Sequence, residues 1–383
     1  MTSRERVRTV LDGGVPDRVP LVMGVSNATG IKMGAYRKVK ALAGIEEPDR
    51  YIYDWPELGT ALPGEAGLER LHADVRGVHD RFPAWVYERN QSREPRSPYI
   101  DSWGSGAKEI RPGEWYPGVH PLASATTVEE IDAYDGWPDM DDPSRFAHIA
   151  EEAARLAAED RYAIMATPWL LFPFERAFAM QGMDTFLLNM AMHPDFAVAL
   201  LRKHLDLCKT LMGHVLDELG DHVDIIKIGD DLGSQEGLLM SPQMYREMLA
   251  PIHNEFVRFI KERTPAKVFF HTDGDVFDLI PDFIEMGIDI LNPIQTSAGR
   301  MSDLARLKSE YGDEITFCGA IDTHHILPNG SPDEVRDEVK RVIGVLGKDG
   351  GYMVASVHTI MSDVPPENVL AMVDAVEEFG AYE

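Results

Sequence analysis

The chain has 383 residues, of which 44% are hydrophobic, so it can bury a large core as two or three domains or as one α/β barrel. Its 37 basic and 64 acidic residues leave a formal charge of -27, which repels phosphate backbones and argues against nucleic acid as a partner. No apolar run approaches a signal peptide core or the roughly 18 residues of a membrane helix. Two cysteines, Cys208 and Cys318, are too few for a disulfide framework. We therefore expect a cytoplasmic protein without a membrane span.

Short apolar strands alternate with amphipathic helices along most of the chain. After a first helix, strands are predicted at about 19–23, 74–78, 162–166, 223–228, 268–271, 288–292, 315–318 and 351–356. Helices are predicted at about 144–159, 242–263, 276–286, 301–311, 333–346 and 366–379. An excursion at about 80–143, rich in Pro, Trp and Tyr, predicts an inserted hairpin with loops.

About eight parallel strands are the number that closes a (β/α)8 barrel. A doubly wound open sheet gives the same alternation, but no Gly-x-Gly-x-x-Gly follows the first strand. The loop 229–233 also sets two carboxylates where a phosphate would lie. The sequence therefore predicts an α/β fold, a single (β/α)8 TIM-like barrel over residues 1–383, with the excursion inserted between early barrel units.

Two potential metal ligands end one predicted strand, in Val268-Phe-Phe-His-Thr-Asp-Gly274. Because strand residues alternate sides, His271 and Asp273 should project together, and Gly274 allows a sharp turn. His358 follows the last strand, and strand ends share one barrel mouth. Two imidazoles and one carboxylate form the ligand set of many catalytic zinc sites, although such a set also holds ferrous iron. A hydrogen-bonded histidine beside a helix-capping Asp273 is the structural alternative.

Other polar residues follow the predicted strands and are candidates for binding substrate. They are Asp230, Asp231, Asn292, Gln295, Asp322 and Glu175. Each one could instead cap a helix or hold a loop. Glu175 could also pair with the adjacent Arg176, while Trp103 and Tyr116 of the excursion could wall an aromatic ring or form a small core of their own.

Seven motifs in order along the chain resemble the uroporphyrinogen decarboxylase superfamily. They are Val15-Pro-Asp-Arg-Val-Pro20, Gly229-Asp-Asp-Leu-Gly-Ser-Gln235, Ser241-Pro-Gln-Met-Tyr245, Phe270-His-Thr-Asp-Gly274, Asp289-Ile-Leu-Asn-Pro-Ile-Gln295, Gly319-Ala-Ile-Asp-Thr323 and Pro365-Pro-Glu-Asn368. The resemblance implies a TIM-like barrel and leads to two functional branches. Decarboxylases carry an arginine-rich segment after the first strand to bind a porphyrinogen with eight carboxylates. Here residues 21–29 contain no arginine, which argues against that substrate.

The second branch contains zinc-dependent methyltransferases that work with corrinoid proteins. Their ligands follow a His-x-Cys pattern with a distal Cys, so the resemblance aligns His271 with the His, Asp273 with the first Cys and His358 with the distal Cys. Imidazole and carboxylate leave zinc more electrophilic than thiolates do, which favours an oxygen substrate. The resemblance thus implies zinc as cofactor, a corrinoid protein as partner and a small methylated substrate, with an aryl methyl ether preferred.

Two other functions fit the same sequence. One is decarboxylation or another lyase reaction on a smaller substrate, which needs neither metal nor corrinoid partner. The other is a non-catalytic barrel that binds a corrinoid protein. The methyl donor, the particular corrinoid partner, a fourth metal ligand and a homo-oligomeric state are left open by the sequence.

Overall fold

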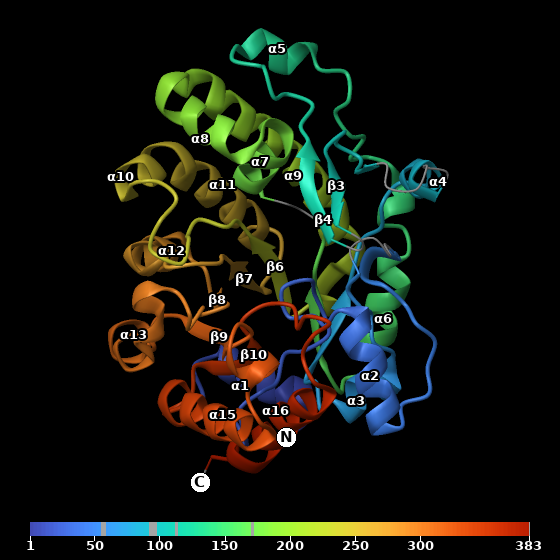
Figure 1. The fold of residues 1–383 in the computed structure, drawn as a ribbon, viewed down its shortest axis with the longest axis vertical. Helices are drawn as coiled ribbons and strands as arrows, with labels where there is room; N and C mark the ends of the chain where they lie inside the picture. The colour runs from blue at the N-terminus through green and yellow to red at the C-terminus, as the bar shows by residue number, and fades with distance from the viewer. Residues whose placement is uncertain (55–58, 92–97, 112–113, 170–171, 383) are drawn as a thin grey trace.

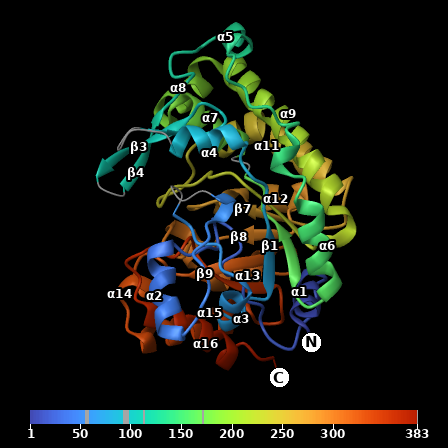
Figure 2. The same ribbon diagram turned by 90° about the vertical axis from the view of Figure 1, so that its right-hand side faces the viewer.

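The computed structural model describes residues 1–54, 59–91, 98–111, 114–169 and 172–382. Within these residues, seven parallel strands form one curled sheet in the order β1-β5-β6-β7-β8-β9-β10. Their bounds are β1 (Val75–Val78), β5 (Ala163–Ala166), β6 (Ile225–Gly229), β7 (Lys267–His271), β8 (Ile290–Asn292), β9 (Thr316–Ile321) and β10 (Tyr352–Ser356). Helices surround the sheet (Figures 1 and 2). The predicted α/β, TIM-like fold is confirmed.

The predicted first strand, at 19–23, occupies the eighth position of the barrel without forming a regular strand. Leu21 makes an isolated parallel bridge with Val354 of β10, and its carbonyl accepts a hydrogen bond from the Asp74 amide at 2.9 Å. Pro20 has no N–H to donate to a ladder. The segment therefore bridges β10 and the start of β1, and the prediction of a full strand there was wrong.

Helices follow the strands as the hydrophobic periodicity predicts. Their bounds are α1 (Ser3–Leu11), α2 (Met33–Ala43), α3 (Glu65–Arg70), α6 (Ile149–Glu159), α7 (Pro173–Gln181), α8 (Met183–Met192), α9 (Pro194–Leu219), α10 (Pro242–Met244), α11 (Ala250–Lys261), α12 (Ile280–Met286), α13 (Leu304–Tyr311), α14 (Ile326–Asn329), α15 (Pro332–Leu346) and α16 (Pro366–Phe379). The helix predicted at 242–263 contains a π-helical turn, Tyr245–Leu249. Among the described residues, no helix is long and apolar enough to span a membrane.

The excursion after β1 contains the predicted hairpin. It comprises α4 (Ala84–Gln91), β2 (Tyr99–Ile100), β3 (Gly106–Arg111), β4 (Glu114–Val119) and α5 (Val128–Ala133), and β2, β3 and β4 form a separate antiparallel sheet. In Figures 1 and 2 the hairpin, α7 and α8 lie at the end of the molecule opposite the two termini. These segments follow the carboxyl ends of β1 and β5, so they flank the barrel mouth.

Side chains of alternate strand positions fill the barrel interior as one buried cluster, which includes Ile225, Phe269, Ile290, Cys318 and Met353. Because strand residues two apart share a face, the next inward positions toward the mouth are Lys227 on β6 and His271 on β7. On β6 and β7, interior packing thus gives way to polar side chains at the next inward position. Cys318 belongs to this packing, and both cysteines are buried and free of disulfide bonds.

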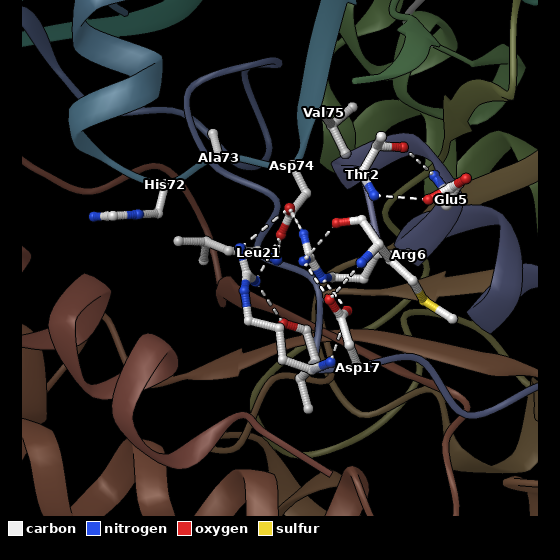
Figure 3. Close-up of polar contacts among 12 residues, drawn as sticks. Thr2, Glu5, Arg6, Asp17, Leu21, His72, Ala73, Asp74 and Val75 are labelled. Carbon is white, nitrogen blue, oxygen red and sulfur yellow. Dashed lines mark hydrogen bonds and ion pairs between the residues drawn. The ribbon is translucent and has the colours of Figure 1, made fainter. Parts of the chain in front are cut away.

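At the opposite end of the barrel, an ion-pair network explains the motif at residues 15–20 (Figure 3). Asp74 is fully buried and accepts hydrogen bonds from Arg6 at 2.7 Å, from Arg18 at 2.9 Å and from the Leu21 amide at 2.8 Å. The Asp17 carboxylate accepts a hydrogen bond from Nε of Arg6 at 2.7 Å. The network ties α1 and the eighth position to the start of β1, and its function is structural.

Candidate metal centre at the barrel mouth

The three predicted metal ligands lie together at the mouth. One ligand atom from each of His271, Asp273 and His358 can be chosen so that all lie within 4.8 Å of one another. The two carboxylate oxygens of Asp273 lie 3.9 Å from His271 Nε2 and 3.9 Å from His358 Nε2. These separations are too long for hydrogen bonds, and they leave space between the three side chains for a cation.

Asn292 fixes the orientation of the His271 ring. Its Oδ1 atom lies 2.6 Å from His271 Nδ1, and its amide nitrogen donates to the Cys318 carbonyl at 3.0 Å. Because the amide nitrogen is committed to that carbonyl, Oδ1 is the acceptor and Nδ1–H of His271 is the donor. The Nε2 lone pair therefore faces Asp273 and His358, as it does in a metal-binding histidine.

Two glycines allow the backbones to approach at this point. A Cβ atom on Gly229 would lie 2.5 Å from the His271 carbonyl oxygen, in register with His271 across the sheet. Gly274 has φ of 91°, and a Cβ there would lie 2.3 Å from the Gly233 carbonyl carbon. The turn predicted after Asp273 is therefore one that favours glycine.

Neighbouring strand ends hold the backbone around Asp273. The Asp231 carboxylate accepts a hydrogen bond from the Asp273 amide at 2.9 Å, and the side-chain Oε1 atom of Gln295 accepts one from the Gly274 amide at 2.6 Å. Both side chains thus support the loop that carries the central carboxylate. Gln295 also lines the large cavity described below, and Asp231 the small one.

The residues present fit a bound cation. Asp273 Oδ1 is buried and has no hydrogen-bond partner in the described part of the chain, which is costly unless another group satisfies it. Burial is the main cause that lowers the pKa of His358 to about 4, so its imidazole is neutral at neutral pH. A neutral imidazole and an unpaired carboxylate oxygen are the donors that zinc or ferrous iron accepts.

Two cavities meet at the triad. The larger, of about 570 Å³, is lined by Asp273, His358, Gln295 and residues of the surrounding loops. The smaller, of about 70 Å³, is lined by Asn27, Tyr53, Pro168, Trp169, Glu175, Lys227, Gly229, Asp231, His271 and His358. His358 lines both cavities, so a cation among the three ligands would lie at the boundary between them.

The small cavity carries an excess of negative charge. Glu175 and Asp231 both line it, and burial followed by repulsion from neighbouring carboxylates raises the pKa of each one. Lys227 is the cation that faces them, and burial lowers its pKa. With Asp273 added, three carboxylates face one ammonium group, a balance that a divalent cation would neutralise.

Two of the predicted substrate residues have structural contacts instead. The Asp230 side chain is fully buried, accepts hydrogen bonds from the amides of Phe174 and Glu175 at 3.0 and 2.7 Å, and lies 3.0 Å from His253 Nε2. It caps α7 and is enclosed behind the site. Asp322 accepts from the amides of His324 and His325, which is a loop cap. Neither Asp230 nor Asp322 is among the described residues that line the two cavities.

Arg176 and the aromatic residues of the excursion, which were candidates for contact with substrate, also have other surroundings. Arg176 pairs with Asp101 at 2.7 Å instead of with Glu175, and its guanidinium lies 4.5 Å from the Trp103 ring centroid. Trp103 is buried, whereas Tyr116 is 64% exposed. Trp103 therefore belongs to the main hydrophobic core and not to a separate small core of the excursion, and Tyr116 faces solvent.

Five residues of the small cavity did not emerge from sequence reasoning: Asn27, Tyr53, Pro168, Trp169 and Lys227. Tyr53 and Trp169 are in edge-to-face contact, with ring centroids 4.9 Å apart, although 116 positions (169 minus 53) separate them in the chain. No local pattern brings them together. Lys227 did have a signal, since it is one lysine within an otherwise apolar strand core.

The fold and these residues define an α/β barrel with a candidate metal centre at its mouth. The chain belongs to the uroporphyrinogen decarboxylase family, because the family model for uroporphyrinogen decarboxylase (URO-D) matches residues 110–379. The family resemblance of the motifs is thereby confirmed.

Curated relatives named uroporphyrinogen decarboxylase are similar at low identity. One from Pelodictyon phaeoclathratiforme is 23% identical over 270 residues, covering 68% of this chain and 71% of the relative. One from Christiangramia forsetii is 25% identical over 281 residues, covering 71% and 74%. A solved structure of a methyltransferase from Methanosarcina mazei matches 99% of both chains with a TM-score of 0.64 and 18% identity, so it shares the fold.

Proposed function

We propose that this protein is a metal-dependent methyltransferase that moves the methyl group of an aryl methyl ether to the Co(I) centre of a separate corrinoid protein. The observation that carries the proposal is the arrangement of His271, Asp273 and His358, with one buried carboxylate oxygen that has no partner among the described residues. A divalent ion held there supplies Lewis-acid polarisation of a substrate oxygen. Zinc is the ion we favour, and the cytoplasm is the compartment.

Other residues of the protein orient the candidate ligands and line the cavity proposed for the substrate. Asn292 sets the tautomer of His271, and Asp231 and Gln295 position the loop of Asp273. The 570 Å³ cavity has room for an aromatic ring, because pockets for small molecules begin at about 300 Å³.

A porphyrinogen substrate fits this site poorly. No arginine is among the described residues that line either cavity, whereas a substrate with many carboxylates calls for guanidinium partners. Decarboxylation of a smaller substrate remains the second candidate, since the curated relatives carry the decarboxylase name.

The test is to measure metal content and methyl transfer in the same preparations. The zinc-loaded protein is expected to methylate Co(I) cobalamin or a corrinoid protein from methoxylated aromatics, and His271→Ala and His358→Ala are expected to lose both zinc and transfer. His325→Ala is the matched control, because His325 is an exposed histidine at the same mouth. Full zinc occupancy in either ligand variant, or transfer that survives complete chelation, would contradict the proposal.

A further inference from the structure

Lys227 is an exception in the barrel interior. It lies on β6 two residues after Ile225, which belongs to the buried interior cluster, and it is in register with the buried Phe269 of β7. Its side chain therefore points inward, where it lines the small cavity beside His271 and His358. Placing a lysine side chain in this layer has a desolvation cost. An interaction that offsets this cost is therefore needed to explain the position of Lys227.

No carboxylate in the part of the chain that the structure describes pairs directly with the Lys227 ammonium group. Lys227 forms neither a hydrogen bond nor an ion pair with any residue of the described ranges, although Glu175, Asp231 and Asp273 all attract it through space. The ammonium group is thus held in the site by the field of the carboxylates, with its three N–H donors available to another molecule.

The sizes of the two cavities limit where a substrate can lie. A dry cavity of about 150 Å³ accepts a benzene molecule, so the 70 Å³ cavity around Lys227 is too small for an aryl ring, and the 570 Å³ cavity is large enough. A ring in the large cavity can direct one substituent past His358, which lines both spaces. An ether oxygen on that substituent would then face Lys227.

On the basis of the proposed function, we propose that the Lys227 ammonium binds the oxygen of the methyl donor and takes up its negative charge as the methyl group departs. In this step the C–O bond breaks, the electron pair stays on oxygen, and the methyl group forms a Co–C bond as Co(I) becomes Co(III). Lys227 keeps its proton and stabilises the phenolate, which solvent protonates after release. Groups placed to meet developing oxyanions have this effect in other enzymes.

Binding of product and substrate analogues tests the proposal without turnover. The probes are para-nitrophenolate, followed by its absorbance, and para-nitroanisole, its neutral methyl ether, at a pH where the phenol is ionised. Lys227→Met is expected to weaken phenolate binding by roughly 10- to 100-fold, the worth of a charged hydrogen bond of about 1.5–3 kcal/mol, with little change for the anisole. Lys227→Arg keeps the charge and should retain the preference for phenolate.

The rate of methyl transfer gives an independent test of the role of the Lys227 charge. With zinc content and thermal stability matched, Lys227→Met is expected to lose roughly 100-fold in kcat on ethers of weakly acidic phenols and much less on ethers of nitrophenols. Lys348→Met is the control, since Lys348 is exposed and precedes β10 at the opposite end of the barrel.

The outcomes separate this inference from the proposed function. Equal weakening of phenolate and anisole, or a rate loss that does not depend on the leaving group, would overturn the role of Lys227 while leaving methyl transfer intact. If the zinc-loaded wild-type protein transfers no methyl group from any ether, the proposed function fails, and the phenolate comparison then decides by itself whether Lys227 recognises an anionic oxygen.

Discussion

The Nδ1 atom of His271 lies 2.6 Å from the Oδ1 atom of Asn292, a hydrogen bond between neighbouring strand ends that turns Nε2 of the histidine toward the candidate metal site. Partners of this kind contribute to metal affinity although they do not touch the ion. Asn292→Leu removes the acceptor and leaves the ring free to adopt either tautomer. We expect the zinc affinity to fall about 10- to 100-fold, measured by competition with a chromophoric chelator.

Asn292→Asp is the matched control for that measurement. An aspartate can still accept the Nδ1–H hydrogen bond, and its charge makes the ligand more basic, so zinc affinity should stay within a few fold of wild type. An equal loss in the Leu and Asp variants would indicate disturbed packing and would refute the orienting role.

The positions of the candidate metal ligands could be predicted from the sequence because a strand end is a local signal. An apolar run followed by His271 and Asp273 fixes both the end of β7 and the common direction of the two side chains. His358 could be added because the strands of a barrel share one mouth. The structure brings all three residues together.

The adjacent residues Asp230 and Asp231 show what a strand-end pattern in the sequence does not predict. Asp230 and Asp231 are equivalent as sequence symbols, but neighbouring residues point to opposite sides. The structure turns Asp230 toward the amides of α7 and Asp231 toward the amide of Asp273. Which of the two faces the mouth depends on the register of β6 and on the placement of α7, and both depend on tertiary packing.

Loop residues of the site carry even less sequence signal. Tyr53 and Trp169 meet across the small cavity from segments with no regular strand or long helix. Chain regions far apart in sequence give no periodicity that would pair them. The closest sequence signal was the inserted aromatics, but Trp103 is buried in the main hydrophobic core and Tyr116 is exposed.

The second prediction concerns the ligand type at position 273. Asp273→Cys restores the His-x-Cys pattern of the methyltransferase branch. We expect this variant to retain stoichiometric zinc, because thiolate is a strong zinc ligand, and to demethylate aryl ethers more slowly, because a thiolate makes the ion a weaker Lewis acid. Zinc content and the initial rate with Co(I) cobalamin are the two measurements. Faster ether cleavage in the Cys variant would show that ligand type does not select an oxygen substrate.

The third prediction concerns the ion-pair network of Asp74, Arg6, Arg18 and Asp17 at the end of the barrel opposite the mouth. Asp74→Ala leaves Arg6 and Arg18 without their buried partner, a change expected to lower the free energy of unfolding by about 3–5 kcal/mol, measured by urea denaturation. Asp17→Ala is the comparison, since the Asp17 side chain is 40% exposed and its loss should cost about 1 kcal/mol or less. Similar losses in the two variants would show that burial does not decide the strength of this network.

The last prediction concerns the stability of the protein in acid. His204 is fully buried, and burial, followed by repulsion from Arg176, lowers its pKa from 6.5 to about 3. As pH falls below 6.5, the unfolded chain binds a proton there while the folded protein does not, so stability decreases until about pH 3. The loss is about 1.4 kcal/mol per pH unit.

His204→Gln removes this titrating group and should therefore flatten the fall in stability. Between pH 7 and pH 4.5, the variant should lose about 2–3 kcal/mol less than wild type, measured by urea denaturation in the presence of chelator so that metal release does not contribute. His325→Gln, at an exposed position, should leave the wild-type slope unchanged. Parallel curves for wild type and His204→Gln would mean that the folded protein takes up a proton at His204 as readily as the unfolded chain does. The imidazole would then have access to water or to a counter-charge that its packing against Trp103 and Trp137 does not provide.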